Sequence, residues 1–120
     1  MHRLLAVLLL ISFVGVSHVD AQTPFYQGKT ITIIVGTKAG DVYDLYPRLL
    51  AEFLPKFIAG APNIIIQNVP GAGSLIAANQ VYNVAKADGL TLGAIYPALY
   101  FNQLIKKSEV KYDWAKFNWI

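Results

Sequence analysis

TITIIVGTKAGD, residues 30–41, is the stretch that decides the fold, because an apolar and β-branched run ends there in a glycine-bearing loop. The same arrangement returns at residues 64–74, IIIQNVPGAGS. Runs that are apolar at nearly every position are typical of strands covered on both faces in a parallel sheet. Glycines let each loop turn tightly, and a following helix adds unpaired N–H groups and the positive end of its dipole. Two such loops lying side by side would form a cradle for an anion.

The rest of the chain alternates between strand and helix signals. Residues 90–95 (LTLGAI) predict a third strand, entered through the Asp88-Gly89 turn. Between the first two strands, apolar residues recur at three- and four-residue spacing, which predicts a helix with one buried face. The residues of that face are Leu45, Leu49, Leu50, Phe53, Leu54 and Phe57. The charged residues expected on the opposite, solvated face are Asp44, Arg48, Glu52 and Lys56.

Two prolines disturb this first helix. A helix tolerates proline in its first turn, where N–H groups have no intrahelical partner, so Pro47 fits if the helix starts near Asp44. Pro55 is expected to kink the helix or to restart it.

Further elements follow the second loop. A second helix is predicted from Gly73 or Ser74 to about Lys86, and a weaker third one over 99–106. The expected buried residues of the second helix are Leu75, Ala78, Tyr82 and Ala85. The order predicts an α/β fold, with a mostly parallel sheet, helices on both faces and right-handed crossovers. Residues 117–120 (FNWI) are expected to begin a buried strand, so we interpret the chain as the N-terminal part of something longer.

The first 21 residues have the pattern of a secretory signal peptide. Arg3 supplies a short basic region, and the apolar run from Leu4 to Val16 is shorter than the roughly 20 residues of a membrane span. Val19 and Ala21 stand where a signal peptidase reads small residues, which predicts cleavage before Gln22. The alternative is an uncleaved anchor. We therefore expect residues 22–120 to be exported.

The composition excludes several classes of function. The chain has no cysteine, and its two histidines, His2 and His18, lie in the predicted signal peptide. The usual zinc sites and the Ser-His and Cys-His nucleophile pairs are thus ruled out for residues 22–120, and we expect no metal, cofactor or catalytic residue there. The net charge is +3, and no Lys or Arg run is longer than Lys106-Lys107, so no nucleic-acid partner is expected.

Candidate ligand-binding residues lie where the strands end, because doubly wound sheets bind ligands outside the carboxyl ends of their strands. Lys38 could pair with a ligand carboxylate, whereas Asp41 and Asp44 would cap the helix or attract an ammonium or hydroxyl group. Ser74 is open to the same two interpretations, a cap or a ligand hydroxyl. The predicted ligand-binding residues are Thr37, Lys38, Ala39, Gly40, Asp41, Asp44, Gly71, Ala72, Gly73, Ser74 and Tyr96.

The Gly71-Ala72-Gly73 segment also invites a dinucleotide-binding interpretation. That fingerprint requires an acidic residue at the end of the next strand, about 20 residues on, to hold the ribose. This chain has Thr91 there and ends the strand at Tyr96. The dinucleotide interpretation is therefore disfavoured.

The ordered combination of motifs is more specific than any one of them. It comprises a signal peptide, KTITIIVG at 29–36, Ala39-Gly40, DLY at 44–46, RLLA at 48–51, NVPGAG at 68–73 and DGLTLG at 88–93. Over nearly all of residues 22–120 this resembles the Bug-type (TctC-like) receptors of tripartite tricarboxylate transporters. The departures are Asp41, where a second glycine is usual, and the prolines Pro47 and Pro55.

The resemblance implies a longer receptor whose two α/β lobes close on a ligand, with residues 22–120 supplying much of the first lobe. It implies capture in the periplasm of a small organic acid, such as a di- or tricarboxylate, an aromatic acid or an acidic amino acid, and its delivery to membrane permease subunits. It places a first binding loop on residues 37–41, with Asp44 opening the helix, and a second on residues 71–74.

Two other classes of function stay open from the sequence. One is an exported enzyme whose catalytic residues lie further along a longer chain, and downstream histidines or carboxylates converging on the same cleft would favour it. The other is a structural or interaction domain, which buried loops would favour.

Overall fold

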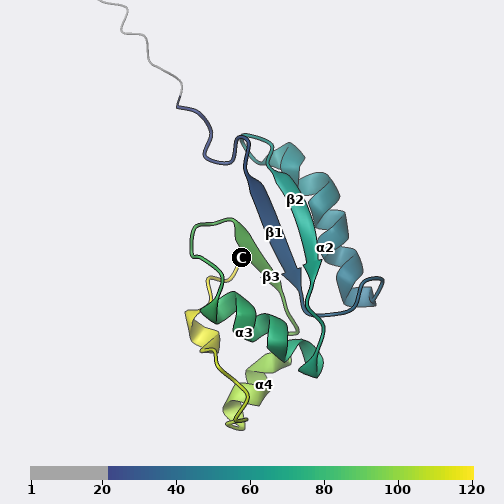
Figure 1. The fold of residues 1–120 in the computed structure, drawn as a ribbon, viewed down its shortest axis with the longest axis vertical. Coiled ribbons are helices and arrows are strands. Elements are labelled where there is room, and N and C mark those ends of the chain that lie inside the picture. Colours follow the sequence, from purple (N-terminus) through teal and green to yellow (C-terminus); the bar gives the residue numbers. More distant parts are fainter. Residues whose placement is uncertain (1–21) are drawn as a thin grey trace, which may run out of the picture.

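The computed structural model describes residues 22–120, so the predicted signal peptide and its cleavage site lie outside the described residues. The element order alternates as expected (Figure 1). The elements are β1 (Thr30–Val35), α2 (Val42–Phe53), the 3-10 turn η1 (Leu54–Phe57), β2 (Asn63–Asn68), η2 (Ala72–Ser74), α3 (Leu75–Asn83), β3 (Thr91–Ala94), α4 (Leu99–Leu104) and η3 (Trp114–Lys116).

The three strands form one parallel sheet in the order β2-β1-β3. Thr30 pairs with Asn63 and Val35 with Asn68 on one side of β1, while Val35 pairs with Ala94 on the other. The predicted α/β fold with a parallel sheet is therefore confirmed, and the carboxyl ends of all three strands lie along one edge.

Helices α2 and α3 cover opposite faces of this sheet (Figure 1). Asn68, on the same face as its partner Val35, is hydrogen-bonded to α2. A Cβ added at Gly93 would meet Val81 of α3, so the face that Gly93 shares with Ile34 lies under α3. The central strand β1 is consequently buried on both faces, as its apolar run predicted.

The edge strand β2 is less covered than predicted. Its residues alternate between exposed and half-buried, and Ile65 is 46% exposed. The reason is the strand order, because α3 crosses β1 and β3 and leaves the α3 side of β2 open. The prediction of a strand covered on both faces holds for β1 and is wrong for β2.

A second apolar cluster lies between α3, α4 and the C-terminal segment. Leu75, Ala78, Leu99 and Tyr112 are buried there, and the Tyr112 hydroxyl donates a 2.8 Å hydrogen bond to the Leu99 carbonyl. The burial predicted for Leu75 and Ala78 is confirmed. The residues packed around the cluster are Tyr82, Ile95, Tyr96, Val110, Trp114 and Phe117.

The predicted buried face of the first helix is wrong. Leu45 and Leu49 are each 57% exposed and Phe57 is 82% exposed, whereas Asp44 and Pro47 are buried against the sheet. Helix α2 is rotated in this way because Asp44 is hydrogen-bonded to β2 and to the preceding loop. The expectation that Asp44 faces solvent is overturned with it.

The boundaries of the first helix also differ from the expectation. Helix α2 begins at Val42, so Pro47 lies in its second turn rather than its first. The helix ends at Phe53, and Pro55 stands at the start of the 3-10 turn that follows, which confirms the predicted restart.

The later helices are shorter than predicted and the final strand is absent from the described residues. Helix α3 ends at Asn83 rather than near Lys86, and Tyr82 and Ala85 are only half-buried. Residues 117–120 form no strand, and Ile120 is fully exposed. The rings of Phe117 and Trp119 pack against Trp114, and the segment does not join the sheet. Within residues 22–120, no helix has the length and apolar character needed to cross a membrane.

Candidate functional site

Three loops meet at the carboxyl edge of the sheet, the first at residues 36–41, the second at residues 69–74 and the third at residues 95–98. The first is joined to β3 by a 3.0 Å hydrogen bond from the Gly36 N–H to the Ala94 carbonyl. The second is joined to the third by a 3.3 Å hydrogen bond from the Tyr96 N–H to Ser74 Oγ. The parallel strand order thus brings the predicted site residues together from three parts of the sequence.

The first loop offers unused hydrogen-bond donors. Within residues 22–120, the N–H groups of Thr37, Lys38 and Ala39 donate to no other group. The Thr37 side chain is buried, with 6% of the residue exposed, and its Oγ1 has no hydrogen-bond partner among the described atoms. An unpaired buried hydroxyl is unfavourable by about 1–3 kcal/mol, so it marks a position where a ligand atom would be stabilising.

The helix that follows this loop is capped by Asp41. The Asp41 carboxylate accepts a 3.0 Å hydrogen bond from the Tyr43 N–H, which makes Asp41 the N-cap of α2. The first interpretation offered for Asp41, a cap, is confirmed, while the same interpretation for Asp44 is wrong. Lys38, Ala39 and Gly40 are exposed at the tip of the loop.

Asp44, Arg48 and Asn68 form a closed group that we call the Asp44 network. Asp44 accepts hydrogen bonds from Arg48 Nε at 2.6 Å, from Asn68 Nδ2 at 2.7 Å and from the Gly40 N–H at 2.7 Å. Arg48 also donates to Asn68 Oδ1 at 3.0 Å, and Asn68 Nδ2 donates to the Thr37 carbonyl at 3.0 Å. The Gly40 N–H predicted to face a ligand is therefore occupied by Asp44.

These contacts keep the Asp44 carboxylate ionised and pair its charge with that of Arg48. The hydrogen bond from Arg48, then those from Asn68 and Gly40, lower the pKa of Asp44 from 3.8 to about 2. Asp44 is thus ionised at neutral pH and is neutralised by the adjacent Arg48 guanidinium. A paired Asp44 does not present a free negative charge to an incoming anion, contrary to what the sequence suggested.

The second loop has an unusual backbone. Gly71, Ala72, Gly73 and Ser74 have φ values of 141°, 47°, 61° and 73°, all in the left-handed range that only glycine adopts easily. Ala72 and Gly73 are exposed at its tip. The positive φ values of the two non-glycine residues, Ala72 and Ser74, are typical of functional loops that the surrounding structure holds in place.

Ser74 is buried and faces the protein. Its hydroxyl makes no cap bond to α3 and instead accepts the hydrogen bond from Tyr96. A Cβ added at Gly36 would lie 2.6 Å from Ser74 Cβ and 3.1 Å from Ser74 Cα. Ser74 thus stands at the predicted N-cap position of α3, but capping by its side chain is wrong, and its hydroxyl joins the second loop to the third.

The third loop contributes an aromatic rim. The rings of Tyr96 and Tyr43 pack with their centroids 4.5 Å apart, and Tyr43 is 50% exposed. Partial burial, with smaller contributions from nearby Asp41 and Tyr43, raises the pKa of Tyr96 above its ordinary value of 10.0. The Tyr96 hydroxyl therefore stays protonated and can donate a hydrogen bond at neutral pH.

The arrangement can bind a small anion by hydrogen bonds rather than by a strong positive field. Free N–H groups, the Thr37 hydroxyl and the N-terminus of α2 all favour a carboxylate, and the aromatic rim can pack against its carbon skeleton. Across residues 22–120, no three His, Cys, Asp or Glu side chains come together as metal ligands would.

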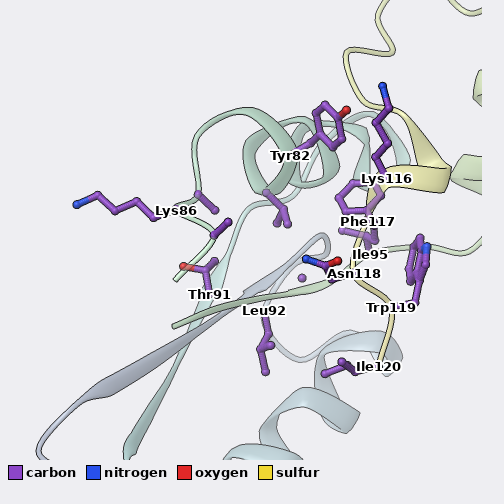
Figure 2. Close-up of a pocket in the computed structure, with 14 residues that line it drawn as sticks. Tyr82, Lys86, Thr91, Leu92, Ile95, Lys116, Phe117, Asn118, Trp119 and Ile120 are labelled. Carbon is purple, nitrogen blue, oxygen red and sulfur yellow. The ribbon is translucent and has the colours of Figure 1, made fainter. Parts of the chain in front are cut away.

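A separate cavity of about 390 Å³ touches the third loop only at Ile95 (Figure 2). It is bounded by α3, β3 and the C-terminal segment, with Tyr82, Thr91, Leu92 and Phe117 in its lining. The Lys86 side chain extends away from the cavity (Figure 2). None of the predicted site residues lines it.

Sequence reasoning missed Arg48, Asn68 and Tyr43 as parts of the site. The charge pattern predicted Arg48 on the solvated face of the first helix. Asn68 was expected only as part of the second strand. A usable signal for Asn68 was present, since an amide at the end of an apolar strand lies at the edge where the loops gather.

Comparison with known proteins points to one group. The chain is 34% identical over 97 residues to a UPF0065 protein in the gbd 5′ region of Cupriavidus necator, covering 81% of this chain and 28% of that protein. It is 38% identical over 72 residues to a UPF0065 protein of Bordetella bronchiseptica, covering 60% of this chain and 21% of that protein. UPF0065 proteins are the Bug, or TctC-like, family. The chain thus spans about a quarter of the length of these curated relatives, and no protein-family model matches it.

Proposed function

We propose that this chain belongs to an exported solute-binding receptor of the Bug type and forms one wall of the cleft that binds a small carboxylate. In this proposal the receptor works in the periplasm by binding and lobe closure, without bond chemistry, and delivers its ligand to the permease of a tripartite tricarboxylate-type transporter. The similarity to UPF0065 proteins and the three loops at the carboxyl edge support it.

The observation that carries the proposal is the unpaired Thr37 hydroxyl beside the free N–H groups of the first loop. A buried hydroxyl without a partner destabilises the free protein, whereas a ligand carboxylate at that position would accept its hydrogen bond. The N-terminus of α2 contributes a further stabilisation of about 0.3–1 kcal/mol to such an anion.

The test is thermal and urea unfolding of the full chain with citrate, succinate, nicotinate or glutamate, in wild type and in Thr37→Val. A compound present at about 100 times its dissociation constant should stabilise the wild type by about 2.7 kcal/mol. Thr37→Val should leave the free protein as stable or more stable, because it removes the unpaired hydroxyl, and should weaken binding by roughly tenfold.

Thr91→Val is the matched control, because Thr91 is half-buried in β3 and lines the separate cavity. It should leave the affinity for the bound compound unchanged. No stabilisation by any of the four compounds would count against the proposal. Equal affinity in wild type and Thr37→Val would place the carboxylate elsewhere.

A further inference from the structure

We propose that the Asp44 network is a positioning unit, which holds the first loop in the conformation that leaves the N–H groups of Thr37, Lys38 and Ala39 unpaired and ties that loop to the end of β2. Its effect on ligand affinity rests on the proposed carboxylate binding. Its effect on loop geometry does not.

The Asp44 network binds some hydrogen-bonding groups of the first loop and leaves others unpaired. The Asp44 carboxylate accepts a hydrogen bond from the Gly40 N–H, and the Asn68 amide donates one to the Thr37 carbonyl. Both ends of the loop tip are therefore held. The N–H groups between those two anchors donate to nothing within residues 22–120. The network therefore fixes both ends of the loop tip and leaves the donors between them without a protein acceptor in residues 22–120.

The side-chain amide of Asn68 is hydrogen-bonded at both its nitrogen and its oxygen. Its Nδ2 donates to two acceptors, Asp44 Oδ1 and the Thr37 carbonyl, while its Oδ1 accepts from Arg48. Each polar atom of the amide thus has the partner that it requires, and a carboxylate of the same shape would place an acceptor against two acceptors. Asn68→Asp changes the hydrogen bonding of the network with almost no change in volume.

The network lies between the first loop and the start of the second loop. Asn68 is the last residue of β2 and directly precedes the second loop, whereas Asp44 and Arg48 lie in the first turns of α2. Residues 20, 24 and 31 positions apart are joined by hydrogen bonds of 2.7 to 3.0 Å. A change at the end of β2 should therefore be felt in the first loop, which it does not adjoin in sequence.

The charged groups around the network are few. Arg48 faces Asp44 from the same helix, β2 presents the neutral Asn68, and the loop presents the Gly40 N–H. The side chains of Lys38 and Asp41, on the same loop, make no hydrogen bond to the Asp44 carboxylate within residues 22–120. In Asn68→Asp the two adjacent carboxyl groups would share a proton at mildly acidic pH, which restores one donor.

The experiment measures amide hydrogen exchange of the full chain by NMR in wild type, Asn68→Asp and the control Asn63→Asp. Asn63 lies on the same strand and is exposed, so its replacement adds the same charge outside the network. At pH 7.5, exchange of the Gly40 amide should be at least tenfold faster in Asn68→Asp, relative to the intrinsic rate. The difference should shrink as the pH falls toward 5, and Asn63→Asp should match wild type throughout.

Sulfate is the anion probe, because it keeps its charge across this pH range. Its affinity should fall about tenfold in Asn68→Asp at pH 7.5 and recover at lower pH, with no change in Asn63→Asp. If Asn68→Asp does not fold, Arg48→Lys serves in its place, since lysine keeps the charge but loses the fork that reaches both Asp44 and Asn68.

Unchanged Gly40 exchange in a folded Asn68→Asp or Arg48→Lys variant would overturn the positioning role. Faster Gly40 exchange without any loss of sulfate affinity would overturn the link between the network and binding. If wild type binds neither sulfate nor carboxylates but Gly40 exchange still responds, the positioning unit stands and the proposed function fails.

Discussion

Replacing Gly36 by alanine should separate the first and second loops. Gly36 directly follows β1, and a Cβ added there would meet Ser74, with Ser74 Cβ only 2.6 Å and Ser74 Cα 3.1 Å away. Both residues are buried, so neither side chain can turn into solvent. The clash involves the backbone of the second loop and cannot be relieved by one rotamer change.

The magnitude follows from two effects. Overpacking of a buried position by one methyl group destabilises a protein by about 1–3 kcal/mol. Moving Ser74 also breaks the hydrogen bond from the partly buried Tyr96 N–H, and a donor left unpaired there is unfavourable by up to about 3 kcal/mol. We therefore expect Gly36→Ala to lower the free energy of unfolding by about 2–6 kcal/mol.

Urea unfolding of the full chain is the assay, with Gly93→Ala as the matched control. Gly93 lies in β3, on the face that α3 covers, but a Cβ there would meet only the side chain of Val81, with its methyl groups at 3.1 and 3.3 Å. That side chain can adjust, so the control should cost less than about 1.5 kcal/mol.

A second substitution tests the cause. Ser74→Gly removes the clashing Cβ and Oγ and suits the φ of 73°, so it should restore at least half of the stability lost in Gly36→Ala. If Gly36→Ala is as mild as Gly93→Ala, or if Ser74→Gly restores nothing, then contact with Ser74 is not what requires glycine at this position.

Three other predictions follow from burial and hydrogen bonding. Leu99 is 1% exposed, so Leu99→Ala should lower the free energy of unfolding in urea by about 2–5 kcal/mol. Leu49 is 57% exposed, so Leu49→Ala should lower it by less than about 1 kcal/mol. Equal losses would contradict the observed rotation of α2. Because the pKa of Asp44 is lowered from 3.8 to about 2, its carboxylate stabilises the folded state above about pH 4, and this contribution is lost as the pH falls toward 2. Unfolding measured from pH 6 to 2 should show a shallower acid decline in Asp44→Asn, and an unchanged slope would refute this. Asn79→Ala removes the bonds that hold residues 109–111, so amide exchange should accelerate there and stay unchanged in β1.

The strands and their loops were predictable because their signals are local. β1 is apolar at nearly every position since both of its faces are covered, and the glycines of the loops stand where the backbone must turn. The Asp88-Gly89 turn was also predicted from local sequence, and Gly89 has the positive φ of 76° that favours glycine. Each of these features depends on neighbours within a few residues along the chain.

The first helix was predicted correctly in existence and wrongly in orientation. Periodicity identifies an apolar face, but it does not say which face the rest of the chain will cover. Helix α2 turns Asp44 toward β2 because the carboxylate finds Arg48, Asn68 and the Gly40 N–H there, and its apolar face is left exposed in residues 22–120. Three hydrogen bonds to one buried carboxylate are not visible in a hydrophobic pattern.

The sequence alone therefore predicted the parallel α/β architecture and the loops that could bind an anion. Backbone conformation and strand burial depend mainly on residues that are close together in the chain, so local patterns indicate them. Only the tertiary structure decided which donors those loops leave free. Thr37 and Asn68 are 31 positions apart, and Ser74 and Tyr96 are 22 apart, so their contacts depend on strand order and register. The physical reason is that hydrogen bonding acts through space, and folding brings these partners within 3.3 Å.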